Sequence, residues 1–236
     1  MSPFEGDLVG ADGYVIPATQ ADVFMWIAGG GYDVVFDVAS AIVDGIASVA
    51  TVVREITGWT YQHNRDLTGF QDGTENPSLV EAPEVALIDE NTPGAGGSIL
   101  LFQLWKHDAR AWRALPTQRQ EAVIGRTKAE SIELDERSMP ADSHVTRTTL
   151  EEGGQALEIF RRNTPYGGVG DHGTVFVGFA KQQQRLLFRP SALDARRMLG
   201  CRPLELRSPK AFALRSMTRH GRPYSSRDAI GRNCGM

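Results

Sequence analysis

The chain carries the stretch RDLTGFQDGTENP at residues 65–77, which has no hydrophobic period long enough for a helix. Gly69 and Gly73 can adopt backbone conformations that are closed to other residues, and Pro77 stops any continuation. We therefore predict a loop that holds the carboxylate of Asp72 rigidly. A surface turn is the plain alternative, because Asp-Gly is a common turn dipeptide. A calcium loop starting at Asp72 fits poorly, because Pro77 and Pro83 stand where Gly and Glu are needed.

Length and composition indicate a globular protein. The 236 residues could form one large domain or two small ones, and 41% apolar and 23% charged residues are ordinary values. No apolar run reaches the roughly 18 residues of a membrane span. The first residues, 1–7, lack the features of a signal peptide. We therefore expect a cytoplasmic protein that does not contact membranes.

Charge is distributed unevenly along the chain. Residues 181–236 hold 13 of the 25 Lys and Arg but only 3 of the 29 acids, a net charge of +10, so the first 180 residues carry −14. Cys201 and Cys234 also lie there, without metal-ligand spacing, and are expected to be free thiols. We interpret this segment as an atypical basic tail that has replaced the original C-terminus. Disorder of the tail is one expectation. A nucleic-acid-binding arm is the functional alternative, but the segment lacks interleaved aromatic residues.

Hydrophobic patterning predicts a mixed fold. A helix period is expected over residues 32–47 and helices over 108–115, 117–125 and 191–199. A turn is expected at 165–168, after a long connection over 77–97. The predicted strands are residues 22–28, 51–57, 98–105, 155–161 and 173–180. Together they indicate an α+β fold with antiparallel sheets and helices on one face.

The segment GFQDG, residues 69–73, resembles the GxxDG signature of the dye-decolorizing peroxidases, and its flanks on both sides resemble the same family. The resemblance implies a ferredoxin-like (βαββαβ) duplication with haem between sheet and loops. On that template residues 1–75 are a truncated first unit that ends in the GxxDG loop. Residues 76–180 are the second unit with the haem site, and residues 181–236 are the atypical tail. The resemblance fades after Ala180.

The same resemblance assigns an iron ligand. His144 lies 72 residues after Asp72 and 17 before Arg161, and matches the family's proximal haem ligand. A surface or capping histidine is the plain alternative, and His63 and His172 remain open as ligands. A ligating imidazole normally donates its other N–H to an acceptor. Three acids could supply it: Glu151, Glu152 and Glu158.

The segment FRRNTPYG, residues 160–167, resembles the family's strand that ends with an arginine over the haem. Arg161 matches that distal arginine, and strand alternation places Asn163 on the same face. An exposed Arg-Arg pair is the plain alternative. The resemblance implies that Asp72 moves the proton of peroxide, while Arg161 stabilises developing charge. Asn163 would position peroxide, and Gly73 and Thr74 would lie against the cofactor.

These residues predict a haem b peroxidase that uses hydrogen peroxide to oxidise aromatic or phenolic donors, including dyes. Two alternatives are kept: a haem-binding or iron-extracting protein without turnover, and an inactive truncated family member. Unpaired strand edges in a shortened first unit also predict a homo-oligomer.

Overall fold

A four-stranded antiparallel sheet forms the centre of the computed structural model, which describes residues 6–9, 15–19, 21–149, 151–187 and 201–203. The strand order is β6-β7-β3-β8. The strands are β3 (Ile99–His107), β6 (Phe160–Gly167), β7 (His172–Ala180) and β8 (Cys201–Pro203). β6 and β7 form a hairpin, and β7 pairs with β3 from Ile99 opposite Ala180 to Lys106 opposite Gly173.

Apolar side chains cover both faces of this sheet. One cluster joins β3 and β7 residues such as Ile99 and Phe176 to Phe70 and to helix residues Trp112 and Val123. The second cluster lies on Leu100, Leu104, Val175 and Val177 and is packed by Phe24 and Ile56, among others. Since β3 and β7 contribute to both clusters, their sequences are apolar almost throughout, as expected for central strands.

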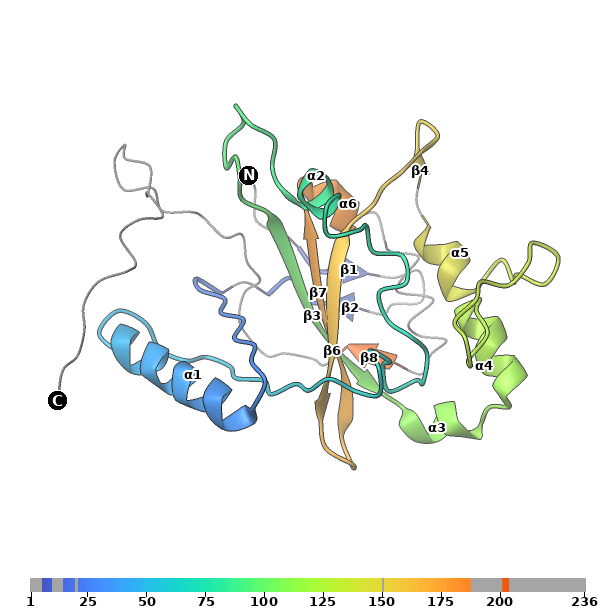
Figure 1. The fold of residues 1–236 in the computed structure, drawn as a ribbon, viewed down its shortest axis with the longest axis horizontal. Coiled ribbons are helices and arrows are strands. Elements are labelled where there is room, and N and C mark those ends of the chain that lie inside the picture. Colours follow the sequence, from blue (N-terminus) through green and yellow to red (C-terminus); the bar gives the residue numbers. More distant parts are fainter. Residues whose placement is uncertain (1–5, 10–14, 20, 150, 188–200, 204–236) are drawn as a thin grey trace.

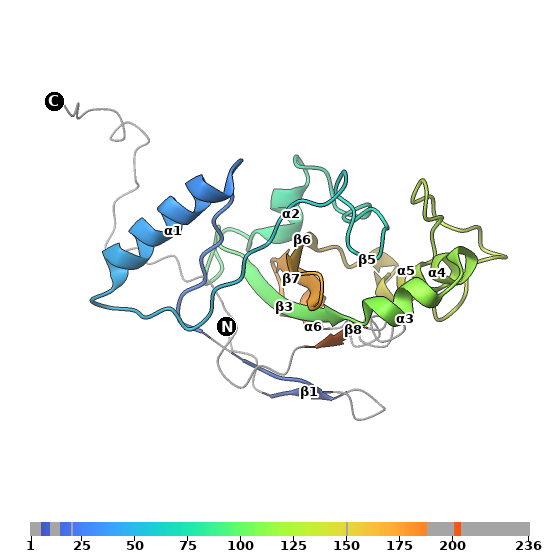
Figure 2. The same cartoon turned by 90° about the horizontal axis from the view of Figure 1, so that it is seen from below.

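Six helices lie around the sheet in the described part of the chain: α1 (Tyr32–Ile46), α2 (Ala82–Ala86), α3 (Ala109–Ala114), α4 (Thr117–Ile124), α5 (His144–Thr148) and α6 (Gln183–Leu187). Figure 1 shows α1 on one side of the sheet and α3, α4 and α5 on the other. Figure 2 shows the same separation from below. Two-residue pairs complete the described elements: β1 (Leu8–Val9) with β2 (Val15–Ile16), and β4 (Glu151–Glu152) with β5 (Gln155–Ala156). Among the described helices, none is long and apolar enough to span a bilayer.

The structure confirms much of the predicted pattern. The helix expected over 32–47 is α1, and those expected over 108–115 and 117–125 are α3 and α4. The strands expected over 98–105 and 173–180 are β3 and β7. The helix predicted over 191–199 lies outside the described residues. The division into two ferredoxin-like units stays a prediction.

Two predicted strands are wrong. Residues 22–28 and 51–57 belong to no described sheet. These segments pack their apolar side chains against a face of the sheet and do not pair with its strands. The ring centroids of Phe24 and Phe102 are 5.3 Å apart, and those of Trp26 and Phe179, which are stacked, are 6.4 Å apart. Packing of this kind requires the same residue types as a strand, so the pattern alone could not distinguish the two.

The predicted strand over 155–161 and the turn over 165–168 are also displaced. Residues 155–156 form β5, residues 157–159 are irregular, and β6 then runs through Pro165 and Tyr166 to Gly167. Proline is tolerated there because β6 is an edge strand and the backbone polar groups of Pro165 face away from β7. The Pro165 carbonyl accepts a hydrogen bond from Trp59 N at 3.2 Å. The turn of the hairpin lies at residues 168–171.

Helix α1 presents an apolar surface. Of its fifteen residues, all of them described, none is buried, and Tyr32 and Phe36 are 63% and 54% exposed. Among the described residues, twelve of the nineteen exposed large hydrophobic side chains fall between Val23 and Trp59. Soluble monomers rarely expose apolar residues in such density.

Candidate functional site

The Asp72 loop, residues 65–77, is a compact turn closed by its own backbone. Asp66 N donates to Phe70 O at 2.9 Å, and Gly69 N donates to Asp66 O at 3.0 Å. Asp72 N donates to Asn64 O at 2.9 Å. Gly69 and Gly73 have φ of 91° and 75°, in the left-handed region that the two glycines predicted.

Side-chain hydrogen bonds between the loop and distant segments anchor this loop. The Arg65 guanidinium donates to Lys128 O at 2.9 Å and to Ala129 O at 2.6 Å. Trp112 Nε1 donates to Thr68 O at 2.9 Å. Thr68 is buried, and its neighbour Phe70 is part of the core. The loop is therefore attached to the side of the sheet that carries α3, and its position holds Asp72 in place.

Strand β6 meets the Asp72 loop through two amide side chains. Asn163 Nδ2 donates to Asp72 Oδ1 at 2.7 Å. Asn76 Nδ2 donates to Arg161 O at 2.8 Å, while Arg161 N donates to Asn76 Oδ1 at 3.0 Å. The structure thus brings Asp72 and Asn163 into contact and holds Arg161 beside them. The Oδ1 of Asn163 is buried and has no hydrogen-bond partner among the described residues.

His144 is the first residue of α5, and the sequence around it explains why the helix begins there. Ser143 is completely buried and caps the helix: its Oγ accepts a hydrogen bond from Thr146 N at 3.2 Å. Ser143 and Val145 pack over Gly125, the residue that ends α4 with φ of 90°. The position of His144 therefore depends on the close approach of α5 to the end of α4.

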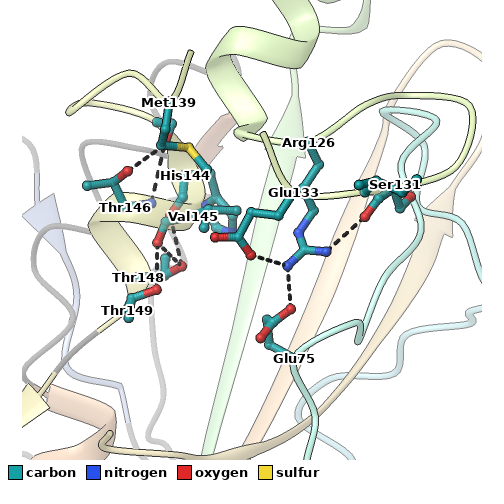
Figure 3. Close-up of polar contacts among 12 residues, drawn as sticks. Glu75, Arg126, Ser131, Glu133, Met139, His144, Val145, Thr146, Thr148 and Thr149 are labelled. Atoms are coloured by element: carbon teal, nitrogen blue, oxygen red, sulfur yellow. Dashed lines mark hydrogen bonds and ion pairs between the residues drawn. The ribbon is translucent and has the colours of Figure 1, made fainter. Parts of the chain in front are cut away.

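Arg126 joins the end of α4 to the Asp72 loop. Its side chain is only 10% exposed and forms ion pairs with Glu75 and, at 2.9 Å, with Glu133. It also donates to Ser131 O at 2.8 Å. Figure 3 shows both carboxylates directed at the guanidinium, next to α5 and His144. A buried cation needs such partners, and they tie the Asp72 loop to the end of α4, where α5 packs over Gly125.

The part of the chain that carries this site matches a known protein family. Residues 63–191, more than half of the chain, match the sequence profile described as Dyp-type peroxidase, C-terminal. The chain belongs to the Dyp-type peroxidase family. The match extends past Ala180, where the resemblance was expected to fade.

Curated relatives of this Dyp-type chain carry the name dye-decolorizing peroxidase. Those of Mycolicibacterium paratuberculosis and Mycobacterium tuberculosis are each 40% identical over 172 residues, which is 71% of this chain and 49% and 51% of theirs. The chain spans about half the length of the curated relatives it matches.

Solved structures of Dyp-type proteins share the fold. A putative Dyp-type peroxidase from Shewanella oneidensis has a TM-score of 0.79 and 30% identity, over 84% of this chain and 67% of that one. A Rhodococcus jostii DypB variant in complex with heme has a TM-score of 0.73 and 39% identity, over 78% and 60%. The encapsulated Dyp-type peroxidase from Mycobacterium smegmatis has a TM-score of 0.79 and 32% identity, over 86% and 69%.

The other histidines of the Dyp-type chain lie in different settings. His172 Nδ1 is 2.9 Å from Gly168 O at the tip of the β6–β7 hairpin, and the His172 ring lies 6.3 Å from that of His107. His63 is exposed in a turn with φ of 55°. His220 lies outside the described residues. The three acids considered as partners of the ligand (Glu151, Glu152 and Glu158) are exposed, and their assignment stays a prediction.

Sequence reasoning missed Asn76, Arg126 and Asp66. Asn76 and Arg126 make contacts with residues 85 and 51 positions away, which no local pattern reveals. Asn76 lies within residues 65–77, and its place in that motif is the only feature of the sequence that could have pointed to it. Asp66 was quoted as a flank, but its titration depends on burial that a sequence does not display.

Asp66 provides a pH-dependent stability prediction. Desolvation is the main cause that raises the pKa of its carboxyl from 3.8 to about 6, and the nearby charge of Asp72 adds to it, while hydrogen bonds from Thr68 oppose it. The folded state therefore binds this proton more tightly than the unfolded state, so stability falls as the pH rises from about 4 to about 6. Replacing Asp66 with asparagine removes the titration and keeps an acceptor for Thr68 N.

We expect Asp66→Asn to be more stable than the natural chain by roughly 1–3 kcal/mol at pH 7.5, with most of that advantage gone at pH 4. Urea unfolding at the two pH values measures the difference. The control is Asp37→Asn, which removes a carboxylate at an exposed position of α1. An Asp66→Asn advantage that is equal at both pH values would contradict the explanation.

Gly125 provides a second stability prediction. A Cβ at this position would lie 3.0 Å from Ser143 Oγ and 3.1 Å from Val145 Cβ, at φ of 90°. Left-handed strain of roughly 1–2 kcal/mol therefore adds to a clash with the residues that flank His144. We expect Gly125→Ala to lower the free energy of unfolding by about 2–3 kcal/mol, measured by urea titration.

The matched control for Gly125 is Gly45→Ala. Gly45 lies within α1, and a Cβ there would meet nothing within 4 Å. Alanine in a helix is favoured over glycine by roughly 0.5–1 kcal/mol, so this variant should be neutral or more stable. Equal effects of the two substitutions would argue against the close packing of α5 on Gly125.

Proposed function

We propose that the chain is a haem b-dependent peroxidase that uses hydrogen peroxide to oxidise aromatic or phenolic donors, including dyes. One observation carries the proposal: Asp72, Arg161 and Asn163 gather where the Asp72 loop meets β6, although Asp72 and Asn163 are 91 residues apart. The names of the relatives support it, as does the structural neighbour in complex with heme.

The residues present fit a haem group. The imidazole of His144 is a suitable axial ligand for haem iron. The Oδ1 of Asn163 is buried and has no partner among the described residues, so it can accept a hydrogen bond from peroxide or water. Gly73 and Thr74 adjoin Asp72 in the loop and are proposed to lie against the cofactor. When bound, haem supplies a redox-active iron that accepts oxidising equivalents from peroxide.

Asp72 is proposed to move the proton. Its Oδ1 accepts the hydrogen bond from Asn163 Nδ2, so the Oδ2 oxygen is left for proton transfer. A carboxylate fixed in this way can take a proton from one oxygen of peroxide and return it to the departing oxygen. Asn163 orients the carboxylate by its Nδ2 and can accept from peroxide at its Oδ1.

Arg161 is proposed to stabilise the negative charge that develops on peroxide. Its backbone is held at both N and O by Asn76, so the side chain starts from a fixed point on β6. A fixed cation in a site of low dielectric stabilises such charge, by roughly 3–4 kcal/mol in analogy with the loss of one oxyanion-hole donor.

A haem-binding or iron-extracting protein without turnover is the alternative function. It would need His144 but gives no role to the contact between Asp72 and Asn163. A visible spectrum of the purified chain with haem, before and after one equivalent of hydrogen peroxide, separates the two. A Soret band that changes with peroxide supports the peroxidase. A band that is indifferent to peroxide supports the carrier, and no specific uptake contradicts both and leaves the inactive family member.

We further propose that the chain self-associates through the apolar region between Val23 and Trp59. The density of exposed hydrophobic side chains there supports this interpretation. Light scattering of the purified chain tests it, and a monomeric mass at high concentration would contradict it. The cytoplasmic location stays a prediction.

A further inference from the structure

We infer that Asn76 is a positioning residue for the site: its side-chain amide clamps the backbone of Arg161 and so fixes β6 against the Asp72 loop. The inference rests on the proposed peroxidase function for its kinetic consequence. The clamp itself is a property of the chain without haem, and it can be tested without activity.

The clamp uses both ends of one amide. Asn76 Nδ2 donates to Arg161 O at 2.8 Å, and Asn76 Oδ1 accepts from Arg161 N at 3.0 Å. β6 is the edge strand of the sheet, so the N–H and C=O of alternate residues point away from β7 and need partners. Asn76 supplies to Arg161 the two hydrogen bonds that a neighbouring strand would otherwise provide.

Gly73 makes the clamp possible. A Cβ at Gly73 would lie 3.0 Å from Asn76 Nδ2, closer than most side-chain contacts allow. Asn76 N also donates to Gly73 O at 3.1 Å, which closes the turn that aims the amide at β6. Pro77 then ends the turn. The second glycine of the GxxDG segment therefore serves the asparagine three residues later, in addition to the loop itself.

The loop and strand are consequently joined at two points: Asp72 to the Asn163 side chain, and Asn76 to the Arg161 backbone. With one hydrogen bond alone, the loop could pivot about its contact with the strand, which is itself held in the sheet by β7. Two fix both position and direction, and productive geometry in an active site requires placement within about 0.5 Å. Loss of Asn76 should therefore disturb Arg161 without removing any group that touches peroxide.

The first test is amide hydrogen exchange of the haem-free chain, followed by NMR. In Asn76→Ala, exchange of the Arg161 amide should accelerate at least roughly tenfold, because its acceptor is gone. The Arg162 amide should keep its rate, since Arg162 lies opposite Val177 in the β6–β7 ladder. Asn76→Asp keeps an acceptor for Arg161 N and should fall between the two. Unchanged exchange at Arg161 in Asn76→Ala overturns the clamp.

The second test is the rate of reaction with peroxide after haem has been loaded. We expect a fall of roughly tenfold or more in Asn76→Ala with haem affinity unchanged, and a smaller fall in Asn76→Asp. The exposed amide Gln118 of α4 supplies the control, Gln118→Ala, which should match the natural chain. A rate within twofold of the natural chain overturns the positioning role. If the natural chain itself takes up no haem, the proposed function fails, while hydrogen exchange still decides the clamp.

Discussion

Replacing His144 by alanine should abolish the specific Soret band of the haem-loaded chain. The expectation follows from the place of His144 at the start of α5. Ser143 caps this helix, and the helix packs closely over Gly125. An imidazole held by a capped helix can keep one orientation toward a metal, and axial ligation by histidine is a main determinant of haem binding. The helix should survive the substitution, because its capping hydrogen bond belongs to Ser143.

A haem titration followed by absorbance measures this prediction. Added imidazole should restore part of the band, since it can occupy the space of the lost ring. His63→Ala and His172→Ala are the controls, because these two residues were the alternative ligands from sequence, and both variants should bind haem normally. A His144→Ala chain that binds haem as tightly as the natural one would remove His144 from the site.

Replacing Arg161 by leucine should slow the reaction with peroxide by roughly 10²–10³-fold, the range seen when one preorganised donor to a developing charge is lost. Asn76 binds the backbone of residue 161, not its side chain, so the clamp should persist in the variant. The effect should therefore fall on the peroxide step, while haem affinity and the free energy of unfolding stay close to those of the natural chain.

Stopped-flow mixing of the haem-loaded variant with peroxide measures the rate. The neighbouring residue supplies the control: the guanidinium of Arg162 lies 5.2 Å from the Phe160 ring, and the residue is exposed. Arg162→Leu should react at nearly the natural rate. Equal losses in the two variants would mean that general charge near β6, and not a fixed guanidinium at position 161, is what matters.

Local sequence was sufficient for part of this fold. α1 and α4 follow a helical period, β3 and β7 are long apolar runs, and the Asp72 loop is set by two glycines with left-handed φ. Each of these depends on residues close together in the chain. The candidate residues Asp72 and Asn163 were also found from short motifs, and the structure places them in contact.

The rest depends on partners that are distant in sequence. Residues 22–28 and 51–57 have the composition of strands, yet they pack on a face of the sheet. The reason is the apolar surface of β3 and β7, against which Phe24 and Ile56 are packed. The ion pairs of Arg126 and the clamp of Asn76 connect segments 51 and 85 residues apart. Patterns within a short window report hydrophobicity and turn chemistry, but they carry no information on which segment lies opposite.

The distance along the chain between Asp72 and Asn163 has a consequence for biosynthesis. Ribosomes add roughly 5–20 residues per second, so the 91 residues that separate the two are made in roughly 5–20 seconds. During that time the Asp72 loop is complete but its docking strand does not yet exist. The hairpin of β6 and β7 is local and can form quickly once synthesised, after which the loop can close on it. If the proposed haem site is correct, its distal side would be completed only after this hairpin has left the ribosome, because a nascent chain interrupted before residue 161 lacks both Arg161 and Asn163.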